Sequence, residues 1–325
     1  MTAFSDRLLA KVAAVGHPLC VGIDPNFSLM PAQFWPKDSS SSSVQQGLLA
    51  FCATVIDGVR DQVAVVKFQA AFFEACGTAG MLALAEAVTL AKKAGLLVIM
   101  DAKRGDIGST AAAYASAYLG GDYLGGSLPN GVTVGSDLVS DALTVSPFLG
   151  GDTLEPLIGI AAGQGKGLFV LVKTSNPGSG DWQDVLLAQG DPASNTAPSP
   201  LNHVLAKQLA GTGAALLGQH SGFSGLGAVV GATYPPQAAA LRALMPRALF
   251  LIPGVGAQGG SLGDALAGFA KDANGQPTGA IVSLSRQITY PSGDEVRAQG
   301  FAGAVRQRLS NVIAEWQRVV QPAIL

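Results

Sequence analysis

Charged residues are scarce in this chain. Asp, Glu, Lys and Arg make up 13% of its 325 residues, and the formal net charge is −2. A surface that binds nucleic acid needs a basic field, so this balance excludes nucleic acid as a general partner. Cysteine and histidine are also rare, with three of each, and their wide spacing forms no CxxC or paired-histidine motif. The spacing therefore predicts neither a disulfide framework nor a transition-metal site.

Long hydrophobic runs are absent as well. No stretch reaches the roughly 18 apolar residues that a transmembrane helix requires. Over residues 4–15, apolar side chains recur at three- and four-residue spacing with charges between them, which indicates an amphipathic helix rather than a secretory signal. Free thiols fit a reducing cytosol, so the sequence predicts a soluble cytoplasmic protein with no membrane partner.

The chain is rich in short β-type runs, and these alternate with stretches of helical periodicity. Eight strand–helix units predict the α/β class and a closed (β/α)8 TIM barrel formed by residues 1–325 as a single domain. A doubly wound open sheet is the alternative. The eight runs are Leu19–Ile23, Val63–Phe68, Leu96–Met100, Ala142–Ser146, Leu168–Lys173, Leu226–Gly231, Ala248–Ile252 and Ala280–Leu284.

Three polar or glycine-rich segments interrupt this repeat and predict loop insertions. They lie at residues 31–43, 120–131 and 176–200. The first ends in five consecutive serines, residues 39–43, which we interpret as a flexible surface loop without chemistry.

The run DAKRGD at residues 101–106 follows the third predicted strand directly. Barrel enzymes place their active sites at the carboxyl ends of the strands. Strand alternation would point Asp101 and Lys103 to the same side. Opposite charges at the mouth of a dry core are costly unless they are paired or used. The run is therefore either a structural ion pair or part of an active site.

Other predicted strands also end in polar residues. Asp24 follows the first, Lys67 lies at the end of the second beside Phe68, and Lys173 ends the fifth, which Thr174–Gly178 follow. In a closed barrel these side chains would converge on the mouth that holds residues 101–106. Alternating charges in one pocket keep each other ionised and supply an acid and a field without a metal.

A second pattern suggests phosphate binding. The glycine-rich run 253–260 follows the seventh predicted strand, and Ser285 and Arg286 follow the eighth. Barrels often bind phosphate with these two loops, and arginine adds a fork of donors. An ordinary glycine-rich turn is the alternative.

Residues 101–110 match the pattern D-x-K-x-x-D-I-x-x-T, which resembles the signature of the orotidine 5′-phosphate decarboxylase family in its longer bacterial branch. Supporting matches run along the whole chain in the family's order. They are Gly22–Pro25, Lys67, Thr174–Gly178, Pro253–Gly260 and Arg286, which follows Ser285 where the family usually has glycine.

The resemblance implies a homodimeric barrel that converts orotidylate to uridylate and carbon dioxide without cofactor or metal. It implies that Lys103 protonates C6 and that Asp101 lies against the departing carboxylate. Asp106 would reach into the partner's site, with Thr110 near the same interface. Lys67 would complete the catalytic set and, with Asp24, would hydrogen-bond the ribose.

The resemblance also implies the remaining contacts to substrate. Ser175 would recognise the pyrimidine edge, Gln258 would bridge phosphate and base, and Arg286 would bind phosphate. Gly259 and Ser285 complete the set of substrate-binding residues.

Two other functions stay open at this point. Related barrel decarboxylases and aldolases that act on sugar phosphates share D-x-K-x-x-D but use magnesium and a further acid on an earlier strand, where this chain has Lys67. A non-catalytic nucleotide-binding protein could use the same scaffold. Such a binder has no need of Lys67, Asp101, Lys103 and Asp106 together.

Overall fold

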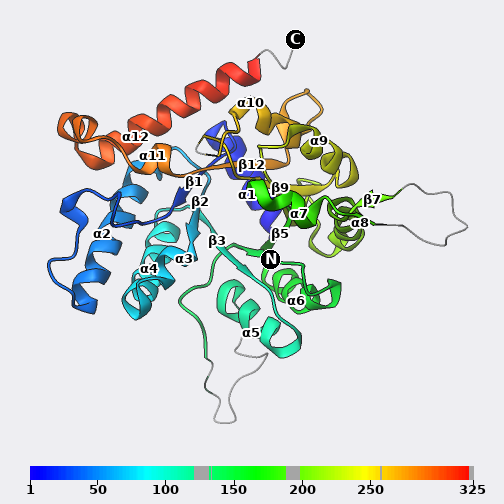
Figure 1. Ribbon diagram of the computed structural model, residues 1–325, viewed down its shortest axis with the longest axis horizontal. Helices are drawn as coiled ribbons and strands as arrows, with labels where there is room; N and C mark the ends of the chain where they lie inside the picture. The colour runs from blue at the N-terminus through cyan, green and yellow to red at the C-terminus, as the bar shows by residue number, and fades with distance from the viewer. Residues whose placement is uncertain (121–131, 133, 188–197, 257, 322–325) are drawn as a thin grey trace, which may run out of the picture.

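Eight parallel strands close into a barrel in this computed structural model, which describes residues 1–120, 132, 134–187, 198–256 and 258–321 (Figure 1). The order around the barrel is β1-β12-β9-β8-β5-β4-β3-β2. This arrangement confirms the predicted (β/α)8 class and excludes the open sheet. The strands are β1 Leu19–Ile23, β2 Val65–Gln69, β3 Leu97–Arg104, β4 Ala142–Val145, β5 Gly167–Lys173, β8 Ser224–Val230, β9 Ala248–Ile252 and β12 Ala280–Leu284.

Helices surround the barrel on the outside, as Figure 1 shows. The long C-terminal helix has left-handed backbone at Gly300 (φ 73°), where two helical segments join. The helices are α1 Phe4–Val15, α2 Ser41–Val59, α3 Ala70–Glu74, α4 Gly77–Lys93, α5 Gly108–Leu119, α6 Glu155–Gln164, α7 Gly180–Gln183, α8 Leu201–Thr212, α9 Pro235–Leu244, α10 Leu262–Ala265, α11 Arg286–Thr289 and α12 Gly293–Val320. Short 3-10 helices span Ala32–Phe34, Gly151–Leu154, Pro177–Ser179, Gly213–Leu216 and Leu266–Gly268.

Two predictions about the insertions are wrong in part. The serine run is not all loop, because Ser40 caps α2 by accepting a hydrogen bond from the Ser43 amide (3.2 Å) and the next three serines form its first turn. Serine is favoured at a helix N-cap because its hydroxyl satisfies a free amide there.

The segment 176–200 holds ordered elements too: α7 and the strand β6 (Leu186–Leu187), which pairs with β7 (Ser199–Pro200). A second small sheet, β10 (Ala270–Lys271) with β11 (Pro277–Thr278), was not predicted. Residues 121–131 and 188–197 of the insertions lie outside the described residues.

The amino-terminal helix closes one end of the barrel. Phe4 and Leu8 of α1 are fully buried among inward-facing strand residues, and the ring of Phe4 meets that of Phe169 edge-on at 6.0 Å. Buried apolar contacts of this kind stabilise by roughly 25 cal/mol per Å². Phe4 also lies against Gly167, the first residue of β5, so α1 covers the end of the barrel at which its strands begin.

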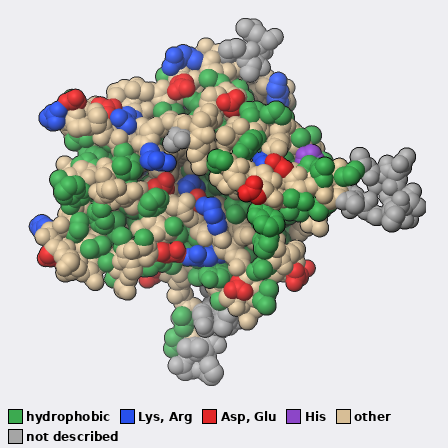
Figure 2. Space-filling model, viewed as in Figure 1, with side chains coloured by type: hydrophobic (Ala, Val, Ile, Leu, Met, Phe, Trp, Pro, Cys, Tyr) green, Lys and Arg blue, Asp and Glu red, His purple; other side chains and the backbone are tan. Residues whose placement is uncertain are grey.

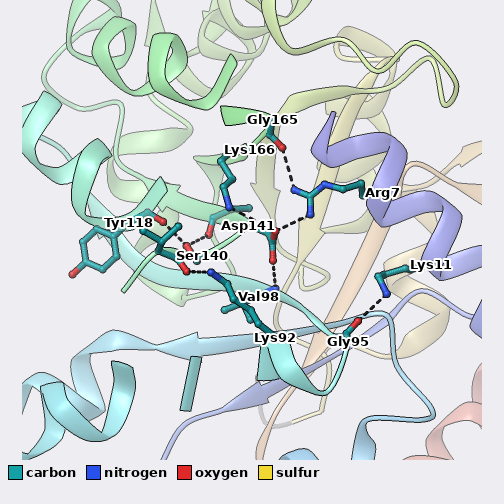
Figure 3. Close-up of polar contacts among 12 residues, drawn as sticks. Arg7, Lys11, Lys92, Gly95, Val98, Tyr118, Ser140, Asp141, Gly165 and Lys166 are labelled. Carbon is teal, nitrogen blue, oxygen red and sulfur yellow. Dashed lines mark hydrogen bonds and ion pairs between the residues drawn. The ribbon is translucent and has the colours of Figure 1, made fainter. Parts of the chain in front are cut away.

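Polar contacts fasten α1 to that closed end (Figure 3). Asp141, just before β4, accepts a hydrogen bond from Arg7 (2.8 Å) and from the Val98 amide (3.0 Å), and Lys166 lies 3.8 Å away. Arg7 also donates to the Gly165 carbonyl (3.1 Å). A buried aspartate that several donors satisfy is a structural anchor, and this cluster joins α1 to the starts of β3, β4 and β5.

Among the helices that the structure describes, none combines the length and the hydropathy that a membrane span requires.

Candidate active site

A cavity of about 650 Å³ opens at the carboxyl ends of the barrel strands. Figure 2 shows it as a hollow near the middle of the face, with basic and acidic side chains gathered around it. Barrel geometry thus brings together residues that lie far apart in the sequence. Eight of the residues predicted from the sequence line it: Asp24, Lys67, Asp101, Lys103, Ser175, Gln258, Ser285 and Arg286.

The Asp101 carboxylate is the centre of the cavity floor. Its Oδ2 accepts hydrogen bonds from Lys67 Nζ (2.8 Å) and Gln69 Nε2 (3.0 Å). Its Oδ1 accepts from Lys103 Nζ (2.6 Å) and Thr144 Oγ1 (2.9 Å). A carboxylate with both oxygens doubly satisfied by charged and polar donors has one orientation only.

These contacts determine the protonation states of Asp101 and Lys67. Burial by itself raises the pKa of Asp101, but the charges and hydrogen bonds of Lys67 and Lys103 outweigh it and hold that pKa well below its ordinary value. Burial lowers the pKa of Lys67, but Asp101 and Asp24 raise it above its ordinary value. Asp101 is therefore an anion, and Lys67 a cation, throughout the neutral pH range.

The Lys103 backbone is strained. Its φ of 51° makes it the only residue other than glycine with positive φ in the described parts of the chain. The pairing of β3 with β4 shifts register between Met100 and Arg104, and the Lys103 amide donates instead to Thr144 Oγ1 (3.0 Å). Such a conformation costs about 1–3 kcal/mol and collects at functional sites. A structural ion pair alone needs no such strain, so the geometry favours the active-site interpretation.

Asp101 and Lys103 lie on the same side, as predicted, but β3 continues to Arg104 rather than ending at Met100. The two lysines differ in exposure: the Lys103 side chain is 45% exposed and that of Lys67 is 8% exposed. Lys67 is thus enclosed beside Asp101, whereas Lys103 presents its ammonium group to the open cavity.

Polar groups at the other end of the cavity have no partner within the described residues. Asp24 Oδ1 and Ser285 Oγ are buried and unpaired. Arg286, at the start of α11, is exposed, and its side chain makes no hydrogen bond or ion pair with the described chain. Ser285 directly precedes α11, with a φ of −126° and a ψ of −90°. Buried unpaired groups of this kind indicate a polar ligand.

The glycine-rich run 253–260 forms a loop beside these groups, and backbone hydrogen bonds join its two ends. Gly254 has a φ of 99° and lies so close to Ser175 that an added Cβ would sit 2.8 Å from the serine Cβ. That approach lets Ser175 Oγ meet the Gln258 amide oxygen at 2.7 Å. Within the loop, the Gly259 amide donates to the Gly256 carbonyl (2.9 Å). Gly259 does not line the cavity, and residue 257 lies outside the described residues.

Two further predicted residues also stay outside the cavity. Asp106 accepts a hydrogen bond from the Ile107 amide (2.8 Å), and Thr110 on α5 is exposed. Lys173 was expected at the mouth but points away from it, donating to Asp184 (2.7 Å) with its ammonium 4.5 Å from the centre of the Tyr234 ring. Lys173 is therefore part of a structural pair, and that prediction is wrong.

Sequence reasoning assigned no role to Gln69 and Thr144, although both contact Asp101 and line the cavity. A signal existed for each, because Gln69 comes two residues after Lys67 and Thr144 is a polar residue inside an apolar strand. Within the described residues, no group of three or more Asp, Glu, His or Cys side chains could hold a metal ion.

Comparisons with known proteins agree with this geometry. Residues 17–300 match the model of the orotidine 5′-phosphate decarboxylase / HUMPS family. An orotidine 5′-phosphate decarboxylase from Rhodopirellula baltica is 44% identical, covering 89% of this chain and 89% of that protein. Its counterpart from Deinococcus radiodurans is 39% identical over 95% and 98% of the two chains. The solved structure of Leishmania donovani OMP decarboxylase is 29% identical and superposes with a TM-score of 0.68, covering 98% of this chain and 99% of that one.

Proposed function

The chain belongs to the orotidine 5′-phosphate decarboxylase / HUMPS family, and from its cavity we propose how its residues carry out the reaction. That reaction is the decarboxylation of orotidine 5′-phosphate to uridine 5′-phosphate and carbon dioxide in pyrimidine biosynthesis. The observation that carries the residue assignment is the Asp101 carboxylate held between two lysines at the cavity floor. The three free cysteines fit the reducing cytoplasm in which we place this activity.

Lys103 is the proton donor in this proposal. When the bond from C6 to the carboxylate breaks, the electron pair stays on C6 and carbon dioxide leaves. The ammonium group of Lys103 stabilises that developing charge and then transfers a proton to C6, leaving a neutral amine. Support comes from its position: Asp101 orients Lys103 Nζ at 2.6 Å while the side chain remains open to the cavity.

Asp101 acts on the reactant. The Asp101 anion repels the substrate carboxylate before the bond from C6 to that carboxylate breaks. This repulsion ends once neutral carbon dioxide has left. Lys67 and Thr144 hold the aspartate in place. In the proposal Lys67 also contacts the ribose together with Asp24.

Phosphate binding takes place at the far end of the cavity. Arg286 and the unpaired hydroxyl of Ser285 provide donors, Gln258 bridges phosphate and base, and Ser175 contacts the pyrimidine edge. Gly259 reaches the phosphate only if the loop closes over the ligand, because its amide is bonded within the loop. Binding energy from this remote group can thus drive closure and raise turnover.

The direct test is loss of orotidylate absorbance with purified protein in excess EDTA. We expect rapid turnover that EDTA does not change. Activity only with magnesium and a sugar phosphate would instead identify a related barrel decarboxylase or aldolase. Tight uridylate binding without turnover of either substrate would identify a nucleotide-binding protein.

Asp106 and Thr110 lead us to propose a homodimer in which Asp106 completes the partner's site. Neither residue lines the cavity of its own chain. Large apolar side chains are exposed around the same end of β3 and β4, namely Ile107 (63%), Phe148 (83%) and Leu149 (51%). Exposed apolar groups gathered in this way favour a protein partner.

Subunit mixing tests this sharing. We expect Lys103→Ala and Asp106→Ala to be inactive separately but to recover about a quarter of parental activity after subunit exchange, because each mixed dimer has one intact site and half of the dimers are mixed. The matched control mixes Lys103→Ala with Lys67→Ala, which leaves no intact site. Failure of the first pair to recover activity would contradict a shared Asp106.

A further inference from the structure

The turn that carries Asp24 has little internal support. Asp24 follows β1 directly, and Pro25 has no amide hydrogen to donate. No described side chain donates a hydrogen bond to the Asp24 carboxylate, and its Oδ1 is buried without a partner. Besides its electrostatic interaction with Lys67, the direction of this carboxylate is therefore set by the backbone of the turn.

The hydroxyl of Tyr290 holds that backbone from both sides of the proline. It donates to the Asp24 carbonyl (2.6 Å) and accepts from the Asn26 amide (2.8 Å). Pro25 cannot donate a backbone hydrogen bond within this turn. The Tyr290 hydroxyl instead joins the residues on either side of the proline, because it acts as donor and acceptor at once. Burial raises the pKa of the Tyr290 hydroxyl, so it stays protonated and keeps donating at neutral pH.

The tyrosine ring is itself held firmly. It stacks on Phe51 with ring centres 5.4 Å apart. The Tyr290 carbonyl accepts from Arg308 (2.9 Å), which forms a two-pronged pair with Glu295 (2.8 and 2.6 Å). Stacking together with bidentate pairing leaves the hydroxyl little freedom to move.

Tyr290 also lies one turn after the phosphate-binding arginine. Its amide donates to the Arg286 carbonyl (3.2 Å) across α11. The segment 286–290 therefore carries both the arginine that faces one end of the substrate and the tyrosine that hydrogen-bonds the Asp24 turn.

We propose that Tyr290 is a positioning residue that aims the Asp24 carboxylate at the substrate. The proposal rests on the proposed function, in which Asp24 binds ribose and Arg286 binds phosphate. Replacing the tyrosine by phenylalanine keeps the ring and its stacking but removes both hydrogen bonds to the turn. The contribution of Asp24 to catalysis then falls although Asp24 itself is unchanged.

The test is a double-mutant cycle with Tyr290→Phe, Asp24→Asn and the double variant, measuring kcat/KM for orotidylate. We expect Tyr290→Phe to lower kcat/KM about 10-fold, Asp24→Asn to lower it further, and the double variant to equal Asp24→Asn, because Tyr290 acts only through Asp24. Thr54→Val, which removes a hydroxyl that donates only to the Ala50 carbonyl on α2, is the control and should match the parent.

Two results would overturn the proposal: parental kcat/KM in Tyr290→Phe, or losses that multiply in the double variant. Multiplying losses together with a lowered melting temperature would indicate a purely structural role. A parent protein that does not turn over orotidylate would instead refute the proposed function, so the two failures are distinguishable.

Discussion

We expect Lys103→Ala to abolish the decarboxylation of orotidylate, with kcat reduced about 10⁴-fold or more. In the proposed function this change removes both the proton donor and the cation beside C6, and each of these effects is worth about 10²-fold or more in enzymes. Uridylate should still bind, because Arg286 and Asp24 at the other end of the cavity are unchanged. Absorbance assays give kcat, and calorimetry with uridylate gives the affinity.

A second substitution at the same position separates the two effects. Lys103→Arg keeps a positive charge but cannot give up a proton at neutral pH. It should therefore bind uridylate and remain inactive. Lys271→Ala, which removes an exposed lysine from β10, is the control and should retain parental kcat. Turnover within tenfold of the parent in Lys103→Ala would remove Lys103 from the mechanism.

Arg286→Ala has the second largest expected effect, a loss of about 10²- to 10³-fold in kcat/KM, mainly through a higher KM for orotidylate. The Arg286 side chain makes no hydrogen bond or ion pair within the described chain, so its donors are free for a phosphate dianion. Charge-assisted hydrogen bonds contribute about 1.5–3 kcal/mol each, and a bidentate pair therefore accounts for a loss of this size.

The substrate itself provides the control for this prediction. Orotidine without the phosphate should be turned over slowly and equally by the parent and by Arg286→Ala, because in the proposed function the arginine contacts only phosphate. Arg318→Ala, on the exposed end of α12, should match the parent on both substrates. An unchanged KM for orotidylate in Arg286→Ala would place the phosphate elsewhere.

The strand pattern could be predicted because it is local. Leu19–Ile23, Ala248–Ile252 and Ala280–Leu284 match β1, β9 and β12 at both ends. Each is an apolar run between polar or glycine-rich segments, and a strand buried on both faces has that appearance in any parallel barrel. The run at 101–106 could be found for the same reason, since its charges directly follow the apolar part of β3.

The fate of each charged side chain could not be predicted from that pattern. Lys67 lies within the apolar strand β2 and Lys173 ends the apolar strand β5, yet Lys67 bonds Asp101 inside the barrel whereas Lys173 bonds Asp184 outside it. Barrel strands are apolar on both faces, so hydrophobicity does not tell which face a given position takes. Only closure of the barrel assigns the inward positions.

The sequence by itself determined the eight strands, the family signature and eight of the residues that line the cavity, because strand periodicity and motif spacing depend on near neighbours. Tertiary structure alone decided the register shift that strains Lys103, the contact of Thr144 with Asp101 and the contact of Tyr290 with the Asp24 turn. These contacts join residues 43 and 266 positions apart. No local pattern encodes such pairs, since they exist only where packing of the whole barrel brings distant strand ends together.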